Sequence, residues 1–243
     1  MNFFSYQKKD SRDFGLRIES KKVLSAPSFN QKFVEIPGRD GRLLLPGGEF
    51  SNAEIVFTCF VIAKDGDELM QRIKDIKAWL LQKPDRYHRL ENSYEKEFFR
   101  KAVFTSKLDI EEEMKKIGRM TLTFSCLPYR YLKSGETQER VSLPSAAIHN
   151  PMEISSLPEF KIQGTGSLSF ILQNREGLFP FELKGDGKEI TIDSERMLVF
   201  SADENRSGSF KAPLFPFLAP GDNRIETSQN ITEFLIRPNW RCL

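Results

Sequence analysis

Residues 55–63 read IVFTCFVIA, and after one lysine residues 65–84 continue with DGDELMQRIKDIKAWLLQKP. The first stretch is short and rich in Val, Ile and Phe, which predicts a β-strand covered on both faces. In the second stretch, apolar residues recur every three or four positions, as on one side of an α-helix: Leu69, Ile73, Ile76 and Leu80. The two stretches together predict a strand followed by a helix over residues 66–82.

The ends of this helix carry their own signals. Asp65 and Glu68 are spaced as in a capping box, in which the first side chain accepts from an early amide and the second reaches back. Pro84 follows the last apolar position and ends the helix. No other long helix is predicted.

Strand patterns follow the helix. Residues 97–110, EFFRKAVFTSKLDI, are predicted as a strand, and residues 118–128, GRMTLTFSCLP, alternate between apolar and polar side chains. Such alternation predicts a strand with one packed face. The intervening residues 111–118, EEEMKKIG, fit either a short helix or a β-hairpin with a charged tip.

The composition changes after Pro128. Residues 133–158 are rich in Ser, Pro, Gly and polar groups, which predicts a linker-like segment that leads into a second domain. Short strand patterns without a helix pattern follow, and KGDGK at residues 184–188 predicts a hairpin turn. We therefore expect a first domain over residues 1–132 and a second over residues 133–243, the latter a β-sandwich or jelly roll.

The composition is that of a β-rich globular protein. The 243 residues include 21 Phe, and the formal net charge of +2 is spread along the chain, which argues against a nucleic-acid or membrane binder. The three cysteines have no metal or disulfide spacing, so reduced, mostly buried thiols are expected. The N-terminus lacks the apolar core of a signal peptide, and the longest apolar run is too short to span a membrane. These features indicate that the protein is made and kept in a reducing cytoplasm until it is used or assembled.

Residues 36–48, IPGRDGRLLLPGG, have the glycine content of a phosphate-binding loop. They lack the Lys, the hydroxyl and the following helix that such a loop requires. We interpret the stretch as a turn, with Asp40 and Gly41 as the tightest hairpin candidate and with Pro37 and Pro46 stiffening its ends.

Catalytic and metal-binding patterns are not found. His88 and His149 do not belong to a metal-binding spacing, and no GxSxG motif is present. We therefore expect no enzyme activity, metal or cofactor. Phe215, Phe217 and Trp240 are aromatic candidates for sugar binding, although we favour packing of Phe215 and Phe217 onto the core.

Eight segments in order resemble the distal tail proteins of long non-contractile tailed phages, the siphophage tail component family: FGLRIES, IPGRDGRL, IKAWLL, FSCLPYRY, PEFKIQGTGSLSF, ITIDSE, FPFLAPGDNRIE and IRPNWRCL. The resemblance spans nearly the whole chain. It implies a mainly β fold, with an N-terminal β-barrel or sandwich-like ring domain that carries one α-helix. A C-terminal galectin-like β-sandwich would follow.

The resemblance also implies a function. Such proteins form a hexameric ring at the distal end of the tail tube of a virion assembled in the host cytoplasm, from a lytic phage or a prophage. The ring joins the major tail tube protein to the tail-associated lysin or fibre and to receptor-binding baseplate proteins for host adsorption, and DNA passes through it without specific binding. The alternative is a carbohydrate-binding module that recognises a bacterial surface.

The resemblance also suggests a role for the turn at residues 36–48. The corresponding loop of the resembled family belongs to the ring-forming domain, so we expect Arg39, Asp40 and Arg42 to contact neighbouring subunits. The alternative is a solvated turn without a partner.

Overall fold

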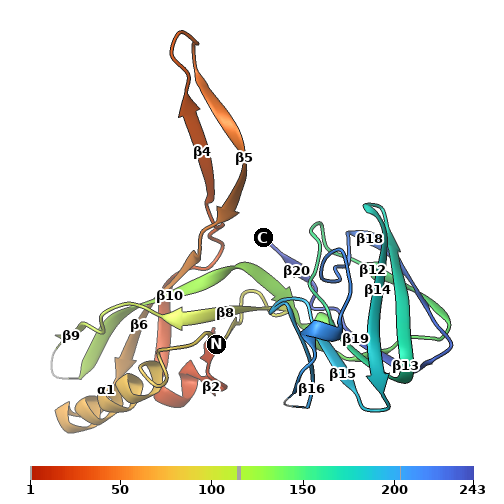
Figure 1. Cartoon of the computed structure of the whole chain (residues 1–243). Helices are drawn as coiled ribbons and strands as arrows, with labels where there is room; N and C mark the ends of the chain where they lie inside the picture. The colour runs from red at the N-terminus through yellow and green to blue at the C-terminus, as the bar shows by residue number, and fades with distance from the viewer. Residues whose placement is uncertain (1, 114–115, 203) are drawn as a thin grey trace. The chain divides into compact units, whose positions relative to one another are not determined.

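The computed structural model describes residues 2–113, 116–202 and 204–243 (Figure 1). The chain divides into two compact units, Met1–Arg130 with Leu243, and Tyr131–Cys242. This division falls close to the boundary expected at residue 132. The described residues are mainly β with one α-helix, which confirms the predicted fold class.

The first unit is built around one antiparallel sheet and a separate two-stranded hairpin. Its strands are β1 (Phe4–Tyr6), β2 (Lys9–Asp10), β3 (Leu16–Lys22), β4 (Phe29–Glu35), β5 (Arg42–Phe50), β6 (Ala53–Ile62), β7 (His88–Asn92), β8 (Phe98–Phe104), β9 (Ile110–Glu113) and β10 (Ile117–Leu132). A 3-10 turn, η1, covers Ser11–Phe14. The sheet order is β2-β1-β7-β8-β10-β6-β3, with β9 beside β10, and β4 pairs only with β5. The sheet ends at β2 and β3, so the described strands form an open sheet and not a closed barrel.

Strand β6 corrects one expectation. Its residues alternate between buried and partly exposed, with Ile55, Phe57, Cys59 and Val61 on the buried face. The sequence predicted burial on both faces, because the apolar run is continuous. The face that carries Val56 and Phe60 is only partly buried, since this antiparallel sheet has one covered and one open side.

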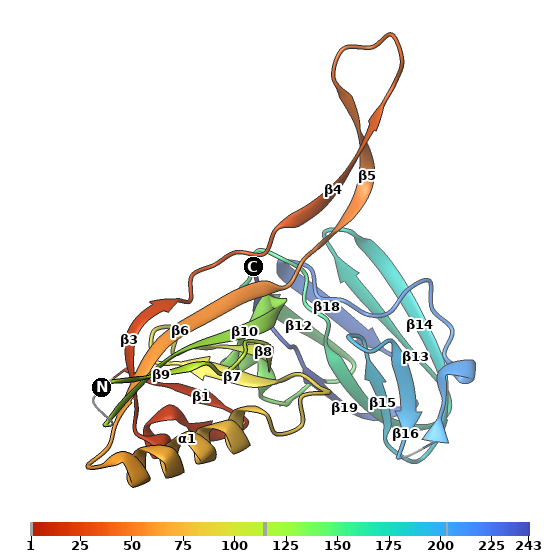
Figure 2. The same cartoon turned by 90° about the vertical axis from the view of Figure 1, so that its left-hand side faces the viewer.

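Helix α1 (Gly66–Leu80) covers the other face of the sheet (Figure 2). Its predicted apolar stripe is buried, and the Trp79 indole nitrogen donates to the Tyr6 carbonyl at 2.9 Å. The Trp79 ring also stacks on Phe14 at a centroid distance of 4.3 Å. Aromatic packing and a satisfied indole thus fix the helix on the sheet.

The helix start differs slightly from a capping box. Asp65 accepts from the Glu68 amide at 2.9 Å, as predicted. The Glu68 side chain accepts from the Lys64 amide at 2.8 Å, one residue before the cap. The helix therefore has two side-chain caps. Asp65 has the predicted partner, whereas Glu68 binds the amide of Lys64 and not that of Asp65.

The ambiguous stretch at residues 111–118 is a hairpin. Strand β9 pairs antiparallel with β10, with Glu113 opposite Ile117. Residues 114 and 115 lie outside the described part of the chain. The hairpin alternative is therefore confirmed, and the helix alternative is wrong.

The second unit is a β-sandwich. Its strands are β11 (Glu139–Arg140), β12 (Ser145–Asn150), β13 (Glu159–Asn174), β14 (Gly177–Asp186), β15 (Ile190–Asp193), β16 (Leu198–Ser201), β17 (Glu204–Asn205), β18 (Gly221–Thr227), β19 (Ile231–Arg237) and β20 (Arg241–Cys242), with 3-10 turns η2 (Lys133–Glu136) and η3 (Ser207–Ser209). The long strand β13 takes part in both sheets. Its first part pairs with β15 and β19, and its second part pairs with β14 and β18. Phe160, Phe170, Phe181 and Phe234 lie in the core between them.

Two expectations about this unit are wrong. Residues 133–158 are not a linker, because they form η2, β11 and β12, and β12 pairs with β18 along its whole length. Residues 184–188 do not close a hairpin, because β14 and β15 pair with different parts of β13. The hairpin in this region joins β13 to β14, where Asn174 lies opposite Gly177. Polar composition alone did not distinguish strands with one open face from a linker.

No disulfide joins the three cysteines in the described part of the chain. Cys59 and Cys126 are buried in the first unit. Burial raises the pKa of each thiol to about 12, because the low-dielectric interior disfavours the thiolate. Both side chains therefore act as small apolar groups of the core at neutral pH.

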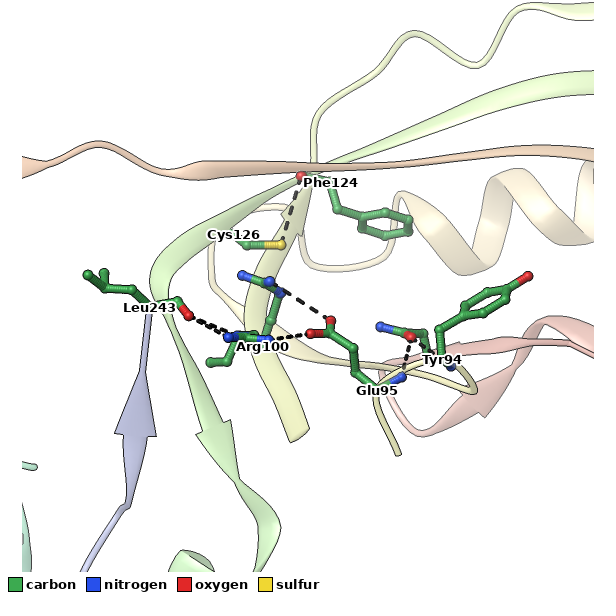
Figure 3. Close-up of polar contacts among 8 residues, drawn as sticks. Tyr94, Glu95, Arg100, Phe124, Cys126 and Leu243 are labelled. Atoms are coloured by element: carbon green, nitrogen blue, oxygen red, sulfur yellow. Dashed lines mark hydrogen bonds and ion pairs between the residues drawn. The ribbon is translucent and has the colours of Figure 1, made fainter. Parts of the chain in front are cut away.

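A buried carboxylate ties the loop after β7 to β8 and β10 (Figure 3). The Glu95 Oε1 atom accepts from Arg130 Nη1 at 2.7 Å, and its Oε2 atom lies 3.9 Å from Arg100 Nη2. Arg130 also donates to the Leu243 carbonyl at 2.6 Å. Because Glu95 and Arg100 are almost fully buried, each charge depends on its partner to offset the loss of hydration.

We expect Glu95→Gln to lower the free energy of unfolding by roughly 3 kcal/mol, because two guanidinium groups lose their anion. The exposed Glu97, two residues away, provides the control, and Glu97→Gln should change it by less than about 0.5 kcal/mol. Urea unfolding at equal protein concentration, followed by tryptophan fluorescence, measures both. Equal stability of the two variants would contradict the structural role of Glu95.

Candidate assembly surface

The hairpin of β4 and β5 forms an arm, residues 29–50, that stands clear of the sheet of the first unit (Figures 1 and 2). Strand β4 is exposed along its whole length, and most of β5 is exposed as well. Isolated two-stranded hairpins are only marginally stable in water. The arm is therefore the part of the first unit that most needs a partner.

The base of the arm is fixed to the first unit. The Ser51 amide donates to the Ser28 carbonyl at 2.8 Å, and the two hydroxyls lie 2.7 Å apart. The Phe29 and Phe50 rings meet edge to face at 4.9 Å, and Phe50 also contacts Tyr129 of β10. These contacts hold both strands where they leave the sheet.

A bulge divides the arm into a basal and a distal part. Gln31 lies opposite Gly48 and Lys32 lies opposite Leu45, so the register shifts at Pro46 and Gly47. Gly48 has a φ of 149°, and a Cβ atom there would lie 2.6 Å from the Asn30 carbonyl oxygen. Only glycine fits this position without strain, because the bulge brings the two backbones together.

The distal arm, residues 32–45, has apolar side chains on both faces. On the first, which we call the aromatic face, Phe33 lies opposite Leu44, and Glu35 lies opposite Arg42. Phe33 is 51% exposed and Leu44 is 52% exposed. Side chains of this size are normally covered when they lie next to each other on a sheet.

The opposite face, the aliphatic face, carries Val34 opposite Leu43 and Lys32 opposite Leu45. Val34 is 41% exposed, and the two leucines are partly exposed. Ile36, directly after β4, is exposed as well. Neither face of the distal arm packs on a core of the described chain.

The tip of the arm contains the three residues expected at a subunit contact. The loop between Glu35 and Arg42 spans residues 36–41, longer than the tight turn expected at Asp40 and Gly41, and its Gly38 and Gly41 have positive φ. Arg42 donates to the Glu35 carboxylate at 3.0 Å, an exposed pair worth less than about 1 kcal/mol. For the side chains of Arg39 and Asp40, no hydrogen bond or ion pair is found within the described residues.

The other candidate residues have structural roles. The His88 Nε2–H group donates to the Lys83 carbonyl at 2.9 Å, and the Nδ1 atom of His149, on β12 and not in a linker, lies 2.7 Å from Asp222 Oδ1. Phe215 packs on the core of the second unit, and Phe217 contacts the Phe179 ring at 5.2 Å. Trp240, in the same core, is only 8% exposed. The packing alternative for Phe215 and Phe217 is therefore confirmed.

Two further properties concern the described residues only. They contain no helix that is long and apolar enough to cross a membrane. They also contain no group of three or more His, Cys, Asp or Glu side chains placed to hold a metal ion.

Comparisons with known proteins find a family match over most of the first unit. Residues 9–126, which include the arm, match the family of the phage tail protein RIFT-related domain. No curated protein sequence shows a significant match.

Solved structures show the same fold over both units. The SPP1 Dit (gp 19.1) protein, described as a paradigm of the hub adsorption apparatus in phages that infect Gram-positive bacteria, has a TM-score of 0.74 at 14% identity over 97% of each chain. Chains of the phage p2 baseplate in its activated conformation, with Sr and with Ca, have a TM-score of 0.55 at 11% and 10% identity over 97% of each chain. Residues 9–126 therefore form a phage tail protein RIFT-related domain, in a chain that shares the two-part fold of the SPP1 Dit protein.

Proposed function

We propose that the chain is a structural virion protein of a long-tailed phage and forms a hexameric ring at the distal end of the tail tube. The family of residues 9–126 and the fold shared with the SPP1 hub protein support this proposal. In this role, the first domain forms the ring and the second domain carries the docking surface for baseplate proteins.

The observation that carries the proposal is the exposed arm. A ring needs a head-to-tail interface, in which two different surfaces of each subunit meet those of its neighbours. The arm offers such a surface outside the folded core, and it lies within the matched family domain. Arg39, Asp40 and Arg42 at its tip would then contact the adjacent subunit, where Arg39 and Asp40 find charged partners.

The ring would have partners on both sides. The major tail tube protein would lie above it, and the tail-associated lysin or fibre and receptor-binding proteins would lie below it. DNA would pass through the channel without specific binding, for which a near-neutral chain with a net charge of +2 is suited. This role requires neither catalysis nor a cofactor, and assembly would take place in the bacterial cytoplasm.

The oligomeric state tests this proposal. We expect the purified full chain to form rings of six copies, visible as six-fold particles in negative-stain electron microscopy and as a sixfold mass in native mass spectrometry. A chain that stays monomeric at high concentration, together with its absence from purified virions, would refute the ring.

The tip contact has its own test. We expect the double variant Arg39→Glu, Arg42→Glu to shift the ring toward monomers, raising the midpoint concentration of assembly by about tenfold or more, because reversed charges at an interface repel their former partners. Lys184→Glu, Lys188→Glu in the second unit makes the same charge change outside the arm and should assemble like the unmodified chain. Normal ring closure of the tip variant would exclude a tip contact and leave the solvated-turn alternative.

A further inference from the structure

Strand β12 is an open edge of the β-sandwich of the second unit (Figure 1). It pairs with β18 over all six of its residues, Ser145–Asn150, without a register shift. On its other side, no backbone pairing is found within the described residues. Such an edge presents a row of N–H and C=O groups that can pair with another chain.

The pairing with β18 shows which backbone groups of β12 face the open side. The Thr227 amide donates to the Pro144 carbonyl at 2.8 Å, directly before β12. Hydrogen-bonded and non-hydrogen-bonded pairs alternate along antiparallel strands, so Ala146, Ile148 and Asn150 bond to β18. The amides and carbonyls of the residues between them therefore point to the open side: Ser145, Ala147 and His149.

The other edges of the sandwich are closed or short. On β14, both backbone groups of Glu182 pair with Lys211, at 2.9 and 2.8 Å, and Pro180 has no N–H group to donate. Strands β11 and β17 contain two residues each. Strand β12 contains no proline, bulge or lysine, which are the usual protections of an edge. Among the described edges of this sandwich, β12 is therefore the long one that is left open.

The open edge is held in place by its neighbours. The buried Asn150 side chain donates to the carbonyls of Ile154 and Leu218 at 3.0 and 2.9 Å, which fixes the end of β12. Near the adjacent end of β18, the buried Asn223 side chain donates to the Ala219 carbonyl at 2.8 Å. A preformed edge loses little conformational entropy when a strand is added to it.

We infer that the β12 edge binds an extended segment of another protein, which adds to the sheet as a further strand. The inference rests on the proposed function, in which the second domain carries a docking surface, and it assigns that surface to β12. Binding of this kind takes its affinity from main-chain hydrogen bonds and its specificity from alternate side chains. An extended backbone matches the spacing of the amides and carbonyls on the open side of β12.

The two faces beside the edge specify the side chains of the added segment. On the inner face, Ala146 and Ile148 pack on the core but are only partly buried, so apolar side chains would extend the core there. On the outer face, the exposed residues of β18 are two carboxylates, Asp222 and Glu226, and one guanidinium, Arg224. The segment should therefore alternate apolar residues with Lys or Arg.

A second copy of the chain fits this edge less well. In a head-to-tail ring, an edge does not meet the same edge of a neighbour, because the two surfaces of the interface are different. Pairing with a copy of the second unit would need another long open edge, and its described residues provide none. A strand of a different protein is therefore the expected occupant.

A proline on the open side of β12 tests the main-chain contact. Ala147→Pro removes one amide from the open side and leaves the bonds to β18, and proline is tolerated in an edge strand where the amide faces solvent. Ala147→Val changes the same side chain but keeps the amide, and it is the matched control. The probe is a short dye-labelled peptide of alternating Val and Lys, and fluorescence anisotropy measures its binding to each full-length chain.

We expect the peptide to bind the unmodified chain and Ala147→Val equally. It should bind Ala147→Pro at least about tenfold more weakly, because a main-chain hydrogen bond is lost and its acceptor is left unpaired. Equal binding to Ala147→Pro, or no binding to the unmodified chain, overturns the inference. A peptide of alternating Val and Glu should bind more weakly than the Lys peptide, and equal or tighter binding would overturn the assigned charge.

A second probe covers a proline variant that folds poorly. The Val and Lys peptide with alternate backbone amides methylated keeps its side chains but loses donors on its pairing side, and the protein stays unmodified. Loss of binding supports strand addition. Unchanged binding of peptides methylated in either alternate set overturns it.

The outcomes separate this inference from the proposed function. If the peptide binds but the chain forms no ring, the ring fails and the edge assignment is supported. If rings form and the peptide does not bind, the ring stands and the edge assignment is overturned. Association of rings with one another at high concentration that Ala147→Pro prevents would assign the edge to a second copy, which also overturns the inference.

Discussion

A ribbon of two strands has no interior, so apolar side chains on both of its faces stay in water until something else covers them. The arm of this protein is such a ribbon, with Phe33 and Leu44 on one face and Val34 and Leu43 on the other. Its exposed apolar surface is unfavourable for a single chain and favourable for an assembly. The hydrophobic effect thus links the fold of the subunit to the proposed ring.

The rest of the first unit provides a rigid base for this arm. Trp79 fixes the helix to the sheet through its stacked ring and its hydrogen bond to Tyr6, and the buried Glu95 ties a loop to two neighbouring strands. Phe50 then connects the arm to Tyr129 of β10. None of these contacts involves the distal arm, so they hold the base whether or not the arm is covered. A flexible base would add an entropic penalty to every subunit contact.

Local patterns allowed much of the fold to be predicted. The helix at residues 66–80 has an apolar period of 3.6 residues, and strand β10 alternates strictly between apolar and polar side chains. Residues close in sequence therefore determine both elements. Residues 133–158 and 184–188 were misread, because their structure depends on pairing with β18 and β13, which is set by distant parts of the chain. Composition shows that a segment is polar, but it does not show which strand lies beside it.

The candidate surface was predicted only in part. The glycines of the tip marked a turn, and the resemblance to phage tail proteins suggested a contact at Arg39, Asp40 and Arg42, which remains a prediction. The two-sided arm was missed, although Leu43–Leu45 carried a signal for it. Pro46 and Gly47 were assigned to the turn itself, whereas they form a bulge within β5 that only the register of the hairpin reveals.

Hydrogen–deuterium exchange of residues 32–45 tests most directly whether assembly covers the arm. The comparison is between the ring and the dissociated subunits of the same chain at low concentration. The account predicts fast exchange in the free subunit and exchange slower by about a hundredfold or more in the ring, because burial of both faces suppresses local opening of the hairpin. Equal exchange of these amides in both states, with the ring intact, would contradict it.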